Sequence, residues 1–168
     1  VLPTCTSSKE LAQDFSDFFI GKIEGIRSDI ETQNSMSNIS TANAHSSSSV
    51  STKMVDFENV SEKTVKQIIQ KSPNKSCELD PIPTWLLKSC IDELLPFLTR
   101  LINASLDNAY VPKEFKCSRI RPLLKKPGLD QNELKNYRPV SNLPFISKVL
   151  EKTVVTQIEA HISSNNLH

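Results

Sequence analysis

The sequence predicts an α+β protein that is mostly helical and carries one short β element. Apolar residues recur at intervals of three and four in several long stretches, which is the helical period. One shorter stretch partly alternates basic with apolar residues, which is typical of a strand. Only 3 of the 168 residues are glycine, whereas 10 are proline. Few tight backbone turns are therefore expected.

The first expected element is an amphipathic helix over residues 7–31. Ser7 and Glu10 form an S-x-x-E capping box at its start. The apolar residues that would share one face are Leu11, Phe15, Phe18, Phe19, Ile23, Ile26 and Ile30. Acidic residues outnumber basic ones on the polar side, whereas a membrane-surface helix needs a basic face. We therefore interpret the apolar face as packing on a core.

Residues 33–53 differ in composition from the segments on both sides. Eight of these 21 residues are serine, and the large apolar residues are isolated. Such a stretch cannot bury enough apolar surface to offset its conformational entropy. The sequence thus predicts a flexible N-terminal arm, which consists of a helical connector at 1–32 and a disordered linker at 33–54. A body at 55–168 follows this arm.

Three helical stretches are expected in the body. Ser61 can cap a short helix that carries Val65, Ile68 and Ile69. The apolar stripe over 85–106 marks the expected core, and Pro96 should end or kink its helix. A last helix is expected over 146–162.

One β element is expected between these helices. Residues 117–126 should form a strand with one buried and one charged face. Pro122 would confine this strand to the edge of a sheet. Pro127 and Gly128 should then turn the chain into a polar loop that runs to 137–139.

Several classes of site are excluded or disfavoured by the sequence. Neither G-x-G-x-x-G nor a P-loop motif can be written anywhere in it. The spacing of the four cysteines and three histidines fits no zinc site. No apolar run is long enough to span a membrane, and no signal peptide is evident. We expect reduced thiols, no membrane partner, no secretion and an intracellular location, cytoplasmic or nuclear.

The charge is close to balanced but unevenly distributed. The chain has 20 basic and 19 acidic residues, which excludes a globally basic nucleic-acid binder. Residues 113–152, however, contain ten basic and four acidic residues, a net charge of +6. A local basic field beside a strand and a loop suits the binding of phosphate groups.

Ordered motifs in the body resemble a known family. They are the tracts KSCELDPIP at 75–83, LINASL at 101–106, VP at 111–112, FK at 115–116, IRPLLKKP at 120–127 and NYRPVSNLPFISKVLEK at 136–152. Over residues 60–168 the chain resembles the reverse transcriptase domain of non-LTR (LINE) retrotransposons, most closely the chicken-repeat-1 and L2-type branch. In one departure, Asn108 and Ala109 stand where relatives commonly carry a glycine after a helix.

The resemblance implies a partial right-hand polymerase fold of which this chain holds the fingers. By motif position, Lys125 or Lys126, together with Arg138, would bind the phosphates of the incoming dNTP. Arginine offers a planar fork for phosphate oxygens and lysine a compact charge, so this clamp would position the substrate without breaking bonds. Three further residues would face nucleic-acid backbone: Lys116, Arg119 and Arg121.

The resemblance also defines what these 168 residues do not supply. The family's palm holds two metal ions with aspartates, one of which belongs to an [FYM]-x-D-D turn, but this sequence contains no adjacent pair of aspartates. We expect no catalytic or metal-binding residue, no bound cofactor and no polymerisation by this chain alone. Mg²⁺ is expected only with a palm. RNA template and dNTP are the expected partners of the full-length protein.

Two other functions remain open at this point. The chain could be a non-catalytic nucleic-acid-binding or interaction module derived from such an element, in which case salt-dependent RNA binding would persist. It could also be a helical scaffold without a ligand, in which case substitutions of Arg138, Lys125 and Lys126 would be silent.

Overall fold

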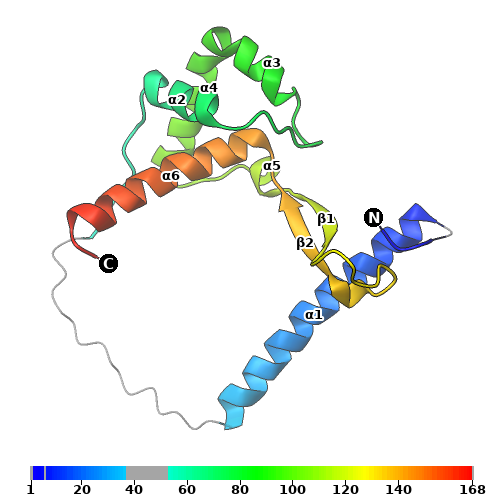
Figure 1. Ribbon diagram of the computed structural model, residues 1–168. Coiled ribbons are helices and arrows are strands. Elements are labelled where there is room, and N and C mark those ends of the chain that lie inside the picture. Colours follow the sequence, from blue (N-terminus) through cyan, green and yellow to red (C-terminus); the bar gives the residue numbers. More distant parts are fainter. Residues whose placement is uncertain (1, 6, 37–52, 168) are drawn as a thin grey trace. The chain divides into compact units, whose positions relative to one another are not determined.

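The computed structural model describes residues 2–5, 7–36 and 53–167. These residues are mostly helical and include one two-stranded sheet, which confirms the predicted α+β class (Figure 1). The chain divides into two compact units. Unit 1 comprises Val1–Ser49 and Ile120–Val140, and unit 2 comprises Val50–Arg119 and Ser141–His168.

Unit 2 is helical. Its helices are α2 (Glu62–Lys71), α3 (Thr84–Ser89), α4 (Ile91–Asp107), α5 (Lys113–Lys116) and α6 (Phe145–Ser164). Helix α4 packs on α2 and α3, and α6 packs on α2 and α5. The three longer helices correspond to the expected helical stretches, whereas the sequence pattern does not predict the single turn of α5.

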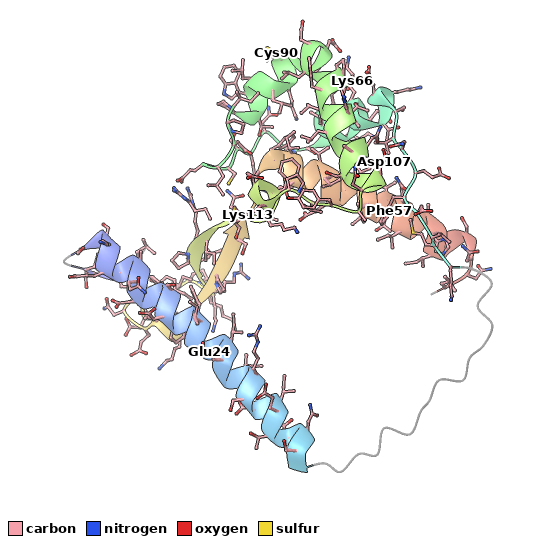
Figure 2. The ribbon with its side chains drawn as sticks, turned by 180° about the vertical axis from the view of Figure 1, so that it is seen from behind. Glu24, Phe57, Lys66, Cys90, Asp107 and Lys113 are labelled. Carbon is pink, nitrogen blue, oxygen red and sulfur yellow. The ribbon has the colours of Figure 1, made fainter. Side chains whose placement is uncertain are left out.

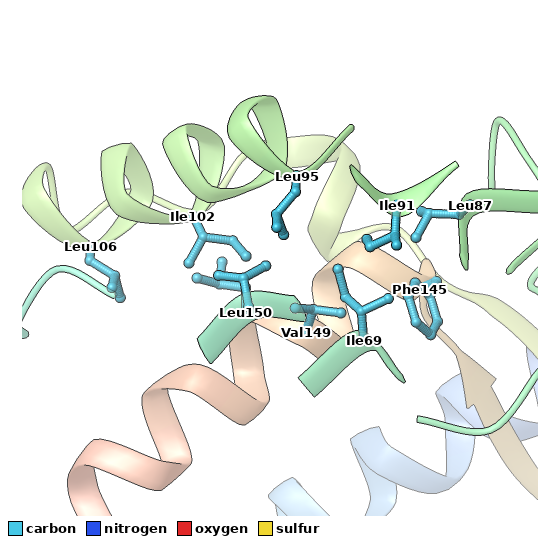
Figure 3. Close-up of a cluster of buried hydrophobic side chains, with 10 residues drawn as sticks. Ile69, Leu87, Ile91, Leu95, Ile102, Leu106, Phe145, Val149 and Leu150 are labelled. Atoms are coloured by element: carbon cyan, nitrogen blue, oxygen red, sulfur yellow. The ribbon is translucent and has the colours of Figure 1, made fainter. Parts of the chain in front are cut away.

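The core of unit 2 forms where α2, α3, α4 and α6 meet (Figure 3). Its ten buried apolar side chains are Val65, Ile69, Leu87, Ile91, Leu95, Ile102, Leu106, Phe145, Val149 and Leu150. Half of them come from the stripe at 85–106, which confirms that this stripe is central to the core. Burial of each large apolar side chain contributes about 1.5–3 kcal/mol before the entropy of ordering is counted.

Two sequence signals for helix ends in unit 2, Ser61 and Pro96, have different outcomes. The Ser61 hydroxyl accepts the Thr64 N–H at 3.2 Å, as expected for a cap of α2. Pro96 is expected to end or kink the helix, but it does not end it, because α4 runs through Pro96. The helical stretch is instead interrupted earlier, at Cys90 between α3 and α4. Proline at 96 removes only the N–H that would reach the carbonyl of Asp92, an exposed residue near the start of the helix.

The C-terminus of α4 carries a non-glycine residue in a left-handed conformation. Ala109 has φ of 48°. Its N–H bonds to the Leu106 carbonyl at 3.2 Å, and the Tyr110 N–H bonds to the Ser105 carbonyl at 3.1 Å. This pair of bonds closes the helix in the way glycine usually does, so alanine stands where a Cβ is sterically unfavourable.

We therefore expect Ala109→Gly to stabilise unit 2 by about 1 kcal/mol, since it relieves a left-handed alanine. Thermal unfolding followed by circular dichroism measures the change. Ala104→Gly is the matched control, because Ala104 lies within the same helix and has ordinary helical geometry. That substitution should destabilise by about 1 kcal/mol, and the same sign for both variants would contradict the strain at Ala109.

Unit 1 contains the long helix α1 (Ser8–Met36). The helix predicted for 7–31 is confirmed, and the Glu10 N–H reaches the Ser7 hydroxyl at 3.5 Å at its start. The helix extends to Met36, so the prediction that the linker begins at 33 is wrong for residues 33–36. Residues 37–52 of that linker lie outside the described residues, and residues 53–54 belong to no helix or strand.

The sheet, most of which belongs to unit 1, pairs β1 (Arg119–Leu124) with β2 (Tyr137–Asn142), with the 3₁₀ turn η1 (Leu134–Asn136) between them. The prediction of β1 is confirmed, but its expected buried face is only partly buried: Leu124 packs on the aromatic residues of unit 1, whereas Ile120 is about half exposed. The sequence pattern assigns the start of β2 to a loop. Its Pro139 and its polar residues conceal a strand whose formation depends on pairing with β1.

A small aromatic core joins α1 to the hairpin within unit 1. Phe15 and Phe19 of α1 and Tyr137 of β2 are buried together. The rings of Phe15 and Tyr137 meet edge to face with centroids 5.0 Å apart, a favourable arrangement for aromatic pairs. The first half of α1 thus supports the hairpin.

Candidate nucleic-acid interface

The register of the hairpin follows from one backbone bond beyond the strand ends. The Lys125 N–H donates to the Asn136 carbonyl at 2.9 Å. In an antiparallel pair, residues lie opposite each other when their numbers add up to the same total, which this bond sets as that of 125 and 136. The ranges of the two strands match this register. Pro122 then lies opposite Pro139 at a non-hydrogen-bonded position. Neither proline therefore costs the ladder a bond.

This register separates the two faces of the hairpin. Tyr137 and Leu124 share the face that packs in the aromatic core with α1. Because side chains alternate along a strand, the neighbouring positions point to the other face. We call this other face the basic hairpin face, and its residues are Arg121, Leu123, Lys125, Arg138 and Val140. All five are exposed.

Of the two lysines, Lys125 lies on the basic hairpin face. Its ammonium donates to the Lys135 carbonyl at 2.6 Å, which leaves two of its three donors for a ligand. Lys126 lies beyond the end of β1 and is exposed. Gly128 follows with φ of 86°, a conformation that favours glycine and that confirms the expected turn at Pro127 and Gly128.

The loop between the strands is held by hydrogen bonds of its own residues. The Asn136 amide donates to the Asp130 carbonyl at 2.9 Å. The Tyr137 hydroxyl donates to the Gln131 carbonyl, also at 2.9 Å. Since Arg138 follows Tyr137 directly, these bonds and the buried ring fix the backbone from which Arg138 projects.

Two of the expected site residues belong to unit 2. Lys116 ends α5, and its ammonium lies 6.0 Å from the centre of the Tyr110 ring. Arg119 is exposed and forms an ion pair with Glu78. Its guanidinium is therefore partly engaged within the protein. The structure thus brings together four of the six expected residues in unit 1, Arg121, Lys125, Lys126 and Arg138.

Asp80 has a structural position in unit 2. One carboxylate oxygen accepts the Phe145 N–H at the start of α6 at 2.6 Å, and the other accepts the Cys77 N–H at 2.5 Å. A carboxylate at a helix N-terminus also interacts favourably with the helix dipole. Asp80 therefore ties the loop at 77–80 to α6.

Two further features bear on the kind of site. No group of three or more His, Cys, Asp or Glu side chains able to hold a metal ion occurs among residues 2–5, 7–36 and 53–167. Within the same described ranges no helix is long and apolar enough to cross a membrane.

Sequence reasoning misses the apolar residues of the basic hairpin face. Leu123 and Val140 are 48% and 40% exposed, and they lie among the arginines. The alternation in 119–124 is a signal for Leu123, but it predicts a buried face there. Val140 can be placed only with the second strand and its register.

The chain is similar, over about half its length, to RNA-directed DNA polymerases of retrotransposable elements. It is 34% identical over 91 residues to the probable RNA-directed DNA polymerase from transposon X-element of Drosophila melanogaster, a match covering 54% of this chain and 10% of the relative. RNA-directed DNA polymerases from mobile element jockey of Drosophila melanogaster and Drosophila funebris are each 30% identical over 95 residues, 56% of this chain and 10% of each relative.

The chain thus spans about a tenth of the length of these curated relatives. No family model matches it. The similarity confirms the expected relation to retrotransposon reverse transcriptases.

Proposed function

We propose that the chain forms part of the fingers of a LINE-type RNA-directed DNA polymerase of the chicken-repeat-1 and L2 kind. In this proposal the basic hairpin face binds phosphate groups of template RNA and of the incoming dNTP. The observation that carries it is the clustering of Arg121, Lys125 and Arg138 on one exposed face of a supported hairpin. The relation to retrotransposon polymerases supports the choice of ligand.

The residues of this face have complementary chemistry. Arg138 presents a planar fork that can hold two phosphate oxygens, and Lys125 adds a compact charge beside it. Lys126 is a second candidate for the triphosphate at the end of β1. Leu123 and Val140 offer apolar surface against which a sugar or a base can pack. Lys116 and Arg119 of unit 2, with Arg121, would contact nucleic-acid backbone.

The proposed role is positioning and not bond formation. Polymerases of this kind use carboxylates that hold two metal ions, and the ions activate the primer hydroxyl and support the leaving pyrophosphate. We assign no catalytic residue to these 168 residues, and Mg²⁺ would enter only with a palm. Residues before the body at 55–168 would connect the fingers to preceding parts of such a protein.

Arg138→Ala is expected to weaken binding of the full chain to single-stranded RNA about fivefold at ~0.1 M salt. The variant loses one contact to a phosphate, and binding then no longer releases the roughly 0.7 of a counterion that this contact would free from the RNA. The slope of log affinity against log salt should fall by about 0.7 for the same reason. Fluorescence anisotropy of a labelled RNA over a salt series measures both quantities.

Arg100→Ala is the matched control, because Arg100 is an exposed arginine on α4. It should change the affinity much less than Arg138→Ala. Arg138→Lys should keep the salt slope but bind less tightly, since lysine cannot hold two oxygens in one plane. Equal losses for Arg100→Ala and Arg138→Ala would contradict a site on the hairpin. Primer extension by the purified chain with Mg²⁺ would contradict the assignment to the fingers alone.

A second candidate is a non-catalytic nucleic-acid-binding module derived from such an element. It is favoured by one observation: α1 supports the hairpin within this chain, through Phe15, Phe19 and Tyr137. The basic hairpin face thus has support from residues of the same chain. Specific RNA binding without any need for further polymerase segments would favour this candidate.

A further inference from the structure

The second half of α1 carries an apolar face that nothing in the described part of unit 1 covers. Ile23, Ile26 and Ile30 are 52%, 50% and 51% exposed. They continue the stripe whose earlier members, Phe15 and Phe19, are buried against the hairpin. Figure 2 shows the side chains of α1 projecting along its whole length, with Glu24 labelled. The apolar face of α1 is therefore packed in the first half of the helix and exposed to solvent in the second half.

The spacing of the three isoleucines is that of a helix–helix seam. Intervals of three and four place Ile23 and Ile30 at one kind of core position of a heptad and Ile26 at the other. Lys22 and Asp29 flank the seam on one side, and Ile20 and Arg27 flank it on the other. Among the described residues, no ion pair involves Lys22, Arg27 or Asp29.

These flanking charges distinguish between two ways of pairing two copies. In a parallel pair, Lys22 of one copy lies beside Arg27 of the other, and the like charges repel. In an antiparallel pair in which Ile23 packs on Ile26 of the second copy, Lys22 lies beside Asp29 of that copy. The two-fold axis then creates this attractive contact twice. The charge pattern is therefore self-complementary only in the antiparallel arrangement.

The position of the hairpin supports the same choice. It covers the first half of α1, around Phe15 and Phe19. In an antiparallel pair the two hairpins lie at opposite ends of the seam, whereas a parallel pair would place both at one end. The seam is then confined to the segment from Ile20 to Ile30.

We infer that this chain self-associates through α1, with Ile23 and Ile26 of two copies packed antiparallel at the centre of the seam, Ile20 and Ile30 at its edges, and two Lys22–Asp29 ion pairs between the copies. The interface is small, so the dimer is a weak one. This inference concerns a surface other than the basic hairpin face and does not depend on the proposed function.

Sedimentation velocity of the full chain, at concentrations up to about 1 mM and at low salt, tests the inference. We expect a monomer–dimer equilibrium that weakens as salt is added, because exposed ion pairs are screened. Lys22→Asp places two like-charged pairs across the seam and should weaken the dimer about tenfold. Asp29→Lys should do the same, and the double variant should restore wild-type association.

The opposite result for Lys22→Asp would overturn the arrangement, since in a parallel pair the introduced carboxylate would lie beside Arg27 of the other copy and tighten the dimer. A chain that is monomeric over the whole concentration range would overturn the inference itself. Ile26→Asn should abolish the dimer while circular dichroism shows the helix retained. Ser28→Asp adds a charge to the exposed surface of α1 away from the seam and should have no effect.

Discussion

Replacement of Asp80 by alanine is expected to lower the free energy of unfolding of unit 2 by about 3–6 kcal/mol, because each of its two hydrogen bonds to a charged group contributes about 1.5–3 kcal/mol. The carboxylate accepts two backbone N–H groups, those of Cys77 and Phe145. Both bonds are partly buried, so alanine would leave two donors without a partner. Since Phe145 also belongs to the core, the start of α6 should loosen first.

Urea unfolding followed by the fluorescence of Trp85 measures this change, since Trp85 is the single tryptophan and lies on α3 of unit 2. Asp80→Asn keeps one acceptor oxygen and should cost about half as much. Asp92→Ala is the matched control, because Asp92 forms an exposed ion pair with Lys66. It should cost less than about 1 kcal/mol. A similar loss for Asp80→Ala and Asp92→Ala would contradict the structural role of Asp80.

Tyr137→Ala is expected to release α1 from the hairpin, because removal of a buried aromatic side chain costs about 3–5 kcal/mol. Tyr137 is 2% exposed and contacts Phe15 edge to face. The aromatic core of unit 1 contains two other buried residues among those that the structure describes, so the remaining contacts are few. RNA binding should weaken with it, since Arg138 would lose its fixed backbone.

Hydrogen exchange checks this prediction: amides in the first half of α1 and in β2 should lose protection, whereas the Trp85 transition of unit 2 should stay unchanged. Tyr137→Phe removes only the bond to the Gln131 carbonyl and should cost about 1 kcal/mol. Tyr110→Ala is the matched control, because Tyr110 is 59% exposed. Unaltered exchange in α1 after Tyr137→Ala would show that the aromatic core does not hold the helix.

Most helices of this protein can be predicted from sequence because their backbone hydrogen bonds and the spacing of their apolar residues are local. Ser61 begins α2 as expected, and the apolar stripe at 85–106 lies in the core. Pro96 shows the limit of the same reasoning. The sequence shows that a proline removes one backbone hydrogen bond, but it does not show that the carbonyl left without this bond belongs to the exposed residue Asp92, so that the helix can continue.

The sequence predicts which residues belong to the candidate site, but it does not predict how they are arranged in space. The basic residues and their motif are visible in the sequence, whereas the face that unites Arg121 with Arg138 exists only through the pairing of β1 with β2. Strand pairing connects residues far apart in the chain, and two prolines opposite each other leave no local signal for it.

The sequence by itself determined the α+β class, the main helices, the core stripe and the concentration of positive charge near residues 113–152. Only the tertiary structure decided that Tyr137–Asn142 is a strand, that Asp80 anchors α6, and that the stripe of α1 is buried at Phe15 and exposed at Ile26. The physical reason is range: helix periodicity and capping act over four residues, whereas pairing, burial and anchoring depend on partners that the chain brings together only when it folds.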